Sequence, residues 1–326
     1  MNCSDTRASK QPSDEIAGKP AGIIFTDFDG TLFNSEHYVT DENFEALRSA
    51  RNAGYITTIA TGRSLFSFRR VAASLSRPIE EYLDYLIFSS GAGVIHSGPS
   101  IRGFDVAVTK DELIEAEGLQ PASAFDAAGL LFRRGIDFMI QRSVPENHGF
   151  VYIKSNGAVN PDFYRRIRIY SEYAESLDCG NEDSELEQIE KACYEGVSQL
   201  VAIVPPAGNA NEDTYKNELI DYLRHRLKDC SVLRTTSPID HRSMWIEVFS
   251  PNVSKSKSAE RLTQSLKLTA TDALAIGNDF NDEDLLHWAG TGRTVDEAPD
   301  EMKKNHKSAG RSVDSAVAAA IKDFID

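Results

Sequence analysis

One short stretch near the amino terminus constrains the fold more than any other part of the chain. Residues 23–25 form an apolar, largely β-branched run long enough for one buried strand, and Asp27-Phe28-Asp29-Gly30-Thr31 follows almost directly. In open parallel α/β sheets, ligands bind beyond the carboxyl ends of the strands, where the loops form a crevice. Asp27 and Asp29 are therefore predicted to share a small space at such an edge. Two carboxylates this close repel each other unless a cation or a shared proton lies between them.

The segments that follow alternate between helix and strand patterns. Residues 41–53 carry apolar side chains at helical spacing, residues 55–60 form an apolar strand, and another helix is expected over residues 64–75. This alternation predicts an α/β fold with a doubly wound parallel sheet and right-handed crossovers. Thr61 stands at the tip of the second strand, where its hydroxyl either caps the next helix or holds a phosphoryl oxygen.

Two further polar clusters stand at element ends in the carboxyl-terminal part of the chain. Lys255 begins a predicted helix, where the helix dipole disfavours an ammonium, so it is either an exposed solubilising lysine or a lysine held there by a nearby anion. Residues 273–276 form another apolar strand, and Gly277-Asn278-Asp279-Phe280-Asn281-Asp282 follows it. Acids thus cluster at a strand tip a second time.

These four stretches, in this order, resemble the four motifs of the haloacid dehalogenase superfamily of phosphotransferases. Ala60-Thr61-Gly62-Arg63 has the form that the second motif takes in the Cof-like branch. The resemblance implies a Rossmann-like core and a Mg²⁺-dependent phosphatase that hydrolyses a small phosphorylated metabolite, with a sugar phosphate favoured, through an aspartyl-phosphate intermediate. An alternative is a phosphotransferase or mutase on the same scaffold.

The resemblance also implies roles for individual residues. The implied catalytic residues are the nucleophile Asp27, the general acid and base Asp29, and the phosphate-binding Thr61 and Lys255. The implied substrate contacts are Gly62, Arg63 and Asn281. The implied Mg²⁺ ligands and supporting residues are Asp27, Asp29 through its carbonyl, Asp279, Asn278 and Asp282.

Three positions depart from the common form of the motifs. Ser90 replaces an Asn, Ser256 replaces a Gly, and Asn278 stands where the fourth motif has its first Asp. Asp279 can supply the carboxylate that Asn278 lacks if the turn directs its side chain toward the metal. Whether Asp279 or Asn278 binds the metal therefore stays open at this point. Asn278 also leaves open a catalytically weakened, ligand-binding descendant.

The middle of the chain is less regular and places no acid pair at a strand end. We expect a disordered leader over residues 1–20, a catalytic core formed by residues 21–104 and 250–326, and an inserted α/β cap over residues 105–249. The superfamily resemblance implies that this cap closes over the crevice and contributes substrate contacts. His148, in a polar loop between two expected strands, is one candidate contact.

Charge and composition exclude several classes of function. The net charge of −15 opposes general nucleic-acid binding, which requires a basic surface. No apolar run approaches the length of a membrane span, and the four cysteines lack zinc-ligand spacing, so we expect a cytoplasmic protein with reduced thiols. Arg165-Arg166-x-Arg168 is either a solvated helix face or a local anion site for the far end of a substrate. The sequence does not indicate an oligomeric state.

A signalling receiver module is the remaining alternative, since receiver domains also place Asp, Thr and Lys at strand ends. Such domains carry no large insertion and lack an acid two residues after the phosphorylated one. The insertion and Asp29 therefore favour an enzyme.

Overall fold

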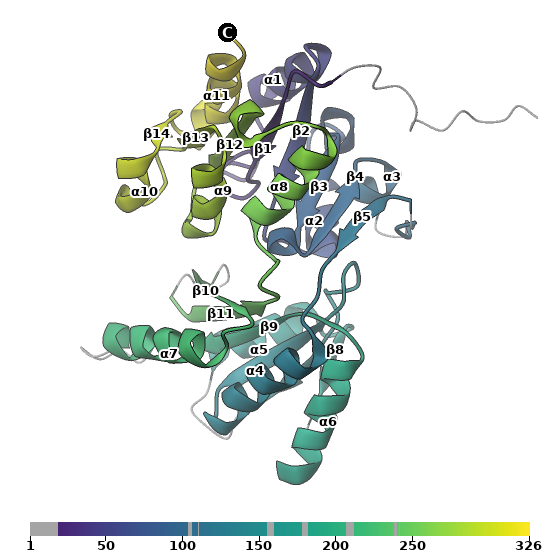
Figure 1. Ribbon diagram of the computed structural model, residues 1–326, viewed down its shortest axis with the longest axis vertical. Coiled ribbons are helices and arrows are strands. Elements are labelled where there is room, and N and C mark those ends of the chain that lie inside the picture. The colour runs from purple at the N-terminus through teal and green to yellow at the C-terminus, as the bar shows by residue number, and fades with distance from the viewer. Residues whose placement is uncertain are drawn as a thin grey trace, which may run out of the picture.

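The chain forms two α/β units, each built on one sheet. The computed structural model describes residues 19–103, 106–109, 111–154, 160–177, 182–206, 212–237, 240 and 242–326. Figure 1 shows the core unit above and the cap unit below, with the chain passing between them twice, through residues 117–120 and through residues 250–254. The predicted α/β class with an inserted cap is confirmed.

The core sheet has eight strands in the order β14-β13-β12-β1-β2-β3-β4-β5. Neighbouring strands are parallel from β14 to β3, and β4 and β5 continue the sheet in antiparallel pairing. The strands are β1 (Gly22–Thr26), β2 (Tyr55–Ala60), β3 (Tyr85–Phe88), β4 (Gly93–His96), β5 (Leu113–Ala116), β12 (Ala273–Gly277), β13 (Thr291–Thr294) and β14 (Lys307–Ser308).

Helices cover both faces of the core sheet because its central strands are apolar on both sides. On β1, Ile24 contributes to the apolar cluster on one face, and Ile23 and Phe25 contribute to the cluster on the other. The described core helices are α1 (Asp41–Asn52), α2 (Leu65–Ala72), α3 (Pro99–Arg102), α8 (Lys255–Ser265), α9 (Glu283–Trp288), α10 (Asp300–Asn305) and α11 (Ala316–Ile325). Short 3₁₀ turns are η1 (Ile79–Tyr82), η2 (Ser89–Gly91), η3 (Ala270–Asp272), η4 (Phe280–Asp282) and η5 (Ser312–Asp314).

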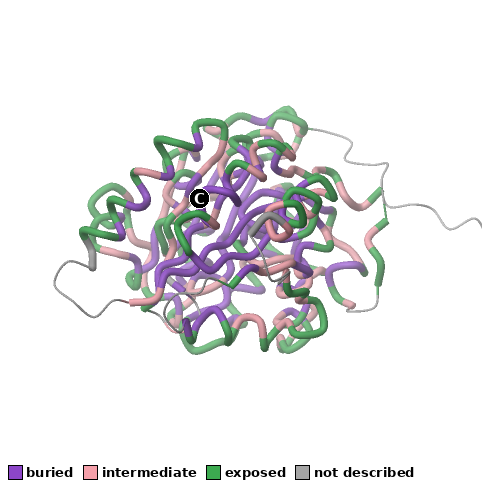
Figure 2. Tube along the Cα trace, turned by 90° about the horizontal axis from the view of Figure 1, so that it is seen from below, coloured by how far each residue is buried: buried purple, intermediate pink, exposed green. Residues whose placement is uncertain are grey.

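The cap sheet has six strands in the order β10-β11-β9-β6-β7-β8. One face packs against helices α4, α6 and α7, and α5 packs against part of the other face. The cap elements are α4 (Pro121–Arg133), β6 (Asp137–Arg142), β7 (Phe150–Ile153), α5 (Pro161–Ile169), β8 (Ala174–Ser176), α6 (Glu182–Tyr194), β9 (Val197–Val204), α7 (Glu212–Arg226), β10 (Ser231–Thr236) and β11 (Met244–Phe249). Figure 2 shows the buried strands as continuous purple tracks inside a largely exposed outer layer.

One expectation is modified by the structure. β5 lies within residues 105–249, which were expected to form the cap, but it pairs with β4 in the core sheet. In the cap, α5 ends at Ile169 and β8 follows it, because residues 174–176 pair with β7. Residues 1–18 of the expected leader lie outside the described residues. Among the helices described, none is both long and apolar enough to cross a membrane.

Candidate active site

The strands that carry the predicted motifs end at the same edge of the core sheet. β12, β1 and β2 are parallel neighbours, so Asn278, Asp27 and Thr61 follow three adjacent carboxyl ends. The backbone N–H of Asp27 donates to the carbonyl of Ile276 at 2.8 Å, which extends the pairing of β1 and β12 by one residue. This is the edge at which parallel α/β sheets bind ligands.

Lys255 joins two of the carboxylates at this edge. Its Nζ donates to Asp27 Oδ1 and to Asp282 Oδ1, each at 2.6 Å, and all three side chains are buried. Lys255 is the first residue of α8, and Ser254 caps that helix by accepting a backbone N–H bond. The helix start therefore places an ammonium directly against the predicted nucleophile.

Asp282 also holds the turn that follows β12. Its Oδ2 accepts the backbone N–H of Asn278 at 2.9 Å and that of Asp279 at 3.2 Å. Because both carboxylate oxygens already have protein partners, this geometry suits a residue that orients Lys255 and the turn better than a direct metal ligand.

The buried group around Asp27 is short of positive charge. Burial raises the pKa of Asp27 to about 7, the Asp282 carboxylate adds to the shift, and Lys255 opposes it. Burial alone would lower the pKa of Lys255, but the charges of Asp27 and Asp282 raise it above its usual value. Two carboxylates with one ammonium leave a net negative charge that another cation would balance.

Asp29 is paired with Arg63. Arg63 Nε donates to Asp29 Oδ2 at 2.7 Å and Arg63 Nη2 donates to Asp29 Oδ1 at 2.6 Å, so the guanidinium binds both oxygens. The predicted acid and base and one predicted substrate contact are thus brought together as a bidentate ion pair, a geometry that a phosphate group can also satisfy.

Gly62, Ser90 and Asn281 meet next to Thr61. A Cβ atom on Gly62 would lie 3.5 Å from Ser90 Oγ and 3.7 Å from Asn281 Nδ2, so the three residues surround one small space. Thr61 is fully buried, and its Oγ1 accepts the backbone N–H of Arg63 at 3.1 Å. The hydroxyl proton of Thr61 remains a donor for a phosphoryl oxygen.

The η2 turn beside this space has unusual backbone geometry. Ser89, Ser90 and Gly91 have φ values of 52°, 55° and 102°, which is the left-handed region that disfavours the two serines. A Cβ on Gly91 would lie 2.4 Å from the Ser254 carbonyl oxygen, so Gly is required where η2 meets the start of α8. The turn is thereby fixed between Thr61 and Lys255.

The side chains of Asn278 and Asp279 lie in different environments. A Cβ on Gly30 would lie 2.3 Å from Asn278 Nδ2, so the Asn278 amide lies directly over the loop that carries Asp27 and Asp29. Asp279 is exposed, and its Oδ1 accepts the backbone N–H of Phe280 at 2.8 Å as the cap of η4. Of the two candidates, Asn278 is the one that contacts the loop of the first motif.

The donor chemistry fits Mg²⁺, although no three His, Cys, Asp or Glu side chains in the described part of the chain are grouped closely enough to hold a metal ion. Mg²⁺ usually takes only one or two protein carboxylates and completes its octahedron with carbonyl oxygens, water and substrate phosphate. The Asp27 carboxylate, a backbone carbonyl of its loop and the Asn278 amide oxygen would supply donors of this kind, and the negative charge around Asp27 favours a cation.

His148 lies at the contact between cap and core. Its ring stacks on Phe66 of α2 with centroids 4.4 Å apart and meets Tyr173 edge to face at 4.6 Å. Asn147 beside it donates to Ser89 Oγ at 2.7 Å in a buried hydrogen bond. The polar loop between β6 and β7 therefore docks on the core next to the η2 turn, a function that its sequence did not suggest.

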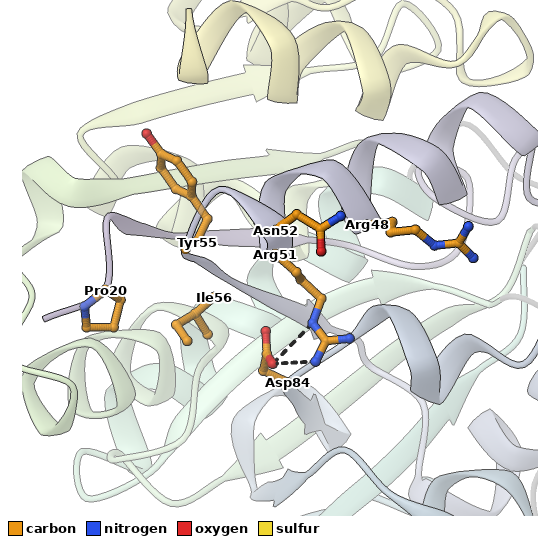
Figure 3. A pocket seen from close by; sticks show the side chains of 8 residues that line it. Pro20, Arg48, Arg51, Asn52, Tyr55, Ile56 and Asp84 are labelled. Atoms are coloured by element: carbon orange, nitrogen blue, oxygen red, sulfur yellow. Dashed lines mark hydrogen bonds and ion pairs between the residues drawn. The ribbon is translucent and has the colours of Figure 1, made fainter. Parts of the chain in front are cut away.

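A separate hollow lies at the opposite edge of the core sheet (Figure 3). It is lined by residues that include Arg51, Tyr55 and Asp84, and Arg51 Nη2 donates to Asp84 Oδ1 at 2.9 Å. Tyr55 begins β2, so this hollow is at the amino ends of the strands, away from the predicted residues. Its charged groups stabilise the fold, since Asp84, the partner of Arg51, also accepts the backbone N–H of Thr57 at 2.9 Å.

The family model of haloacid dehalogenase-like hydrolases matches residues 24–321. The chain belongs to this family. The match includes all four motifs and the cap, which confirms the family resemblance and its Cof-like branch.

Individual relatives are distant but extend over nearly the whole chain. A 5-amino-6-(5-phospho-D-ribitylamino)uracil phosphatase of Bacillus subtilis (strain 168) is 23% identical over 304 residues, covering 93% of this chain and 95% of that protein. A sugar phosphatase of haloacid dehalogenase subclass IIB has a TM-score of 0.64 at 16% identity, covering 93% of this chain and 98% of that chain. A superfamily member from Bacteroides thetaiotaomicron has a TM-score of 0.66 at 16% identity, covering 98% and 99%. At these identities the structural matches establish the shared fold.

Proposed function

We propose that the protein is a Mg²⁺-dependent phosphatase that hydrolyses a small phosphorylated metabolite, with a sugar phosphate as the favoured class. The observation that carries this proposal is the buried Lys255 ammonium bound at 2.6 Å to both Asp27 and Asp282 at the ligand-binding edge of the sheet. Family membership and the relatives named as phosphatases support it.

Asp27 is the proposed nucleophile. One of its carboxylate oxygens attacks phosphorus and the bond from phosphorus to the leaving oxygen breaks, which forms an aspartyl-phosphate. Lys255 and the Thr61 hydroxyl bind phosphoryl oxygens, and Gly62 and Asn281 border the space beside them. Mg²⁺, held by the Asp27 carboxylate, the Asp29 carbonyl and the Asn278 side chain, would neutralise charge on the phosphoryl group when bound.

Asp29 is the proposed general acid and base. In its protonated form it donates a proton to the leaving oxygen, and the resulting carboxylate then takes a proton from the water that hydrolyses the aspartyl-phosphate, which restores the protonated form. Since Arg63 binds both of its oxygens, we infer that substrate phosphoryl oxygens replace Asp29 at Arg63 and so release the carboxyl group for proton transfer.

A phosphate-release screen over sugar phosphates with Mg²⁺ tests the function. We expect Asp27→Asn to lower kcat/KM by about 10³-fold or more while the fold is kept, because the nucleophile is lost. Asp300→Asn, at an exposed acid on α10, is the matched control and should behave as wild type. Equal activity of the Asp27→Asn protein and this control would reject the nucleophile.

One observation favours a second candidate function. Asn278 supplies no charge where the fourth motif has an acid, which suits a weakened member that binds a phosphorylated ligand with little turnover. An assay with Mg²⁺ and an aryl phosphate separates the two, since only the phosphatase releases phosphate faster than its Asp27→Asn variant.

A further inference from the structure

The face of the cap sheet that looks toward the core carries polar groups among apolar ones. Glu247 stands on β11 between Trp245 and Phe249, two residues from each, so all three share one face. Phe249 belongs to an apolar cluster of the core, and Leu233, which pairs with Glu247 across the sheet, packs against the same cluster. Glu247 therefore points into the space between the cap and the strand edge that holds Lys255.

The Glu247 carboxylate has no hydrogen bond or ion pair to any residue that the structure describes. It is half-buried, and burial raises its pKa, while the charges of Arg166 and Lys255 oppose the shift. A half-buried carboxylate without a protein partner is partly desolvated, and only water or a ligand can supply its hydrogen bonds. Its surroundings indicate that a ligand is the missing partner.

Arg166 on α5 is held in place with its hydrogen-bonding capacity unused. Its guanidinium lies 4.7 Å from the centroid of Trp245 and 5.3 Å from that of Tyr170, and its Nε is buried without a partner. Asp162, one helical turn before it, is occupied by accepting the Trp245 Nε1 hydrogen bond at 2.7 Å. Aromatic contacts fix the guanidinium, but within the described chain no carboxylate lies within ion-pair distance of it.

Two amides extend this polar group. Gln141 and Gln199 are direct partners across β6 and β9, and Gln199 is on the same face as Val201, which pairs with Glu247. Both glutamines are nearly inaccessible to solvent, at 2% and 9% exposure. The face thus presents one carboxylate, one guanidinium and two amides, which together offer both donors and acceptors with no net charge.

We propose that Glu247, Arg166, Gln141 and Gln199 form a cap subsite that binds the hydroxyl groups of the substrate's leaving group. The inference rests on the proposed phosphatase function and specifies its substrate class. Hydroxyl groups both donate and accept, so a sugar or polyol satisfies all four side chains at once. A second phosphate in the leaving group would be attracted by Arg166 but repelled by the Glu247 carboxylate, whereas hydroxyl groups can bind to both side chains. The subsite therefore selects polyol monophosphates over bisphosphates and over esters without hydroxyl groups.

Selectivity among three phosphate esters tests this subsite. Ribitol 5-phosphate has hydroxyl groups, phenyl phosphate has none in its leaving group, and fructose 1,6-bisphosphate carries a second phosphate. We expect Glu247→Gln to lower the ratio of kcat/KM for ribitol 5-phosphate to that for phenyl phosphate by about 10- to 100-fold, the effect of losing a charged hydrogen-bond partner. The same variant should raise the ratio of kcat/KM for fructose 1,6-bisphosphate to kcat/KM for ribitol 5-phosphate.

Glu218→Gln is the matched control, because Glu218 is exposed on α7, on the opposite side of the cap sheet. It should leave both ratios as in the wild type. Loss of activity on all three esters in equal proportion would show that Glu247 supports the fold alone, and unchanged ratios would overturn the subsite.

A binding measurement separates failure of the subsite from failure of the proposed function. Calorimetric titrations with Mg²⁺ compare the Asp29→Asn protein with the same protein carrying Glu247→Gln. We expect Glu247→Gln to weaken the binding of ribitol 5-phosphate about tenfold more than the binding of inorganic phosphate. If the wild type releases no phosphate from any ester, the function is wrong and this titration alone decides the subsite. Equal weakening of both ligands, or of neither, would overturn it.

Discussion

The two faces that enclose the proposed site differ in how their charged side chains are paired. At the strand edge of the core, Lys255 is bound to two carboxylates and Arg63 is bound to Asp29. On the facing side of the cap, Glu247 and Arg166 lie near each other, but neither makes a hydrogen bond to a described residue. The comparison indicates that the core groups are oriented before substrate arrives, whereas the cap groups reserve their hydrogen bonds for a ligand.

Removing the Lys255 ammonium from the core should have the largest effect on stability. We expect Lys255→Met to lower the free energy of unfolding by about 3–5 kcal/mol, because Asp27 and Asp282 would remain buried without their partner. Urea unfolding without Mg²⁺ measures the change. Lys257→Met, at an exposed lysine on the same helix, is the control, and equal stability of the two variants would contradict the paired character of the core edge.

A carboxylate added at position 278, the proposed metal-binding position, should increase the negative charge at the core edge. We expect Asn278→Asp to tighten the apparent Mg²⁺ affinity by about tenfold, since ligand charge sets the affinity of such sites. The readouts are the Mg²⁺ dependence of activity and of the melting temperature. Asp279→Asn is the comparison variant and should leave the Mg²⁺ affinity unchanged. A loss of Mg²⁺ affinity in that protein would identify Asp279, the cap of η4, as the ligand instead.

Neutralising the cap carboxylate should have a small effect on stability, in contrast to Lys255. We expect Glu247→Gln to leave the free energy of unfolding unchanged or to raise it by about 1 kcal/mol, because functional groups without partners cost stability. Glu115→Gln is the matched control, since Glu115 is paired with Arg261 at 2.8 Å. A loss from Glu247→Gln larger than that from Glu115→Gln would show that Glu247 has a structural partner.

The contact that joins the two regions should respond weakly to pH. Burial lowers the pKa of His148 below its ordinary value of 6.5; Glu146 opposes the shift and Arg69 and Arg142 add to it. The unfolded chain therefore binds a proton more readily than the folded one, and stability should fall as the pH drops below about 6.5. Melting temperatures of wild type and His148→Phe between pH 8 and pH 5 measure this, and a constant difference would exclude the titration.

The residues of the core edge could be predicted because each follows a local pattern. Asp27, Thr61 and Asn278 directly follow apolar strands, and Lys255 begins an amphipathic helix. Parallel strands bring their carboxyl ends to one edge, so position along the chain was enough to predict a shared site. The pairing of Asp29 with Arg63 could not be predicted in the same way, because side-chain direction depends on the loop geometry.

The middle of the chain was harder to predict because its contacts join distant parts of the sequence. β5 and β8 have four and three residues, too few for a clear alternation, and their pairing depends on partners elsewhere. Asn147 reaches Ser89 across 58 positions. Glu247 did carry a signal that was missed, since it is the one charged residue in the strand Met244–Phe249 and a buried charge marks a functional face.

The two crossings between core and cap have a practical consequence for engineering. All proposed groups for phosphoryl transfer lie before residue 117 or after residue 250, and all four groups of the cap subsite lie between these crossings. The intervening segment can therefore be exchanged as one cassette, joined at two short loops. A chimaera that carries the cap of a relative should have the substrate selectivity of that cap, while the core residues for phosphoryl transfer stay unchanged.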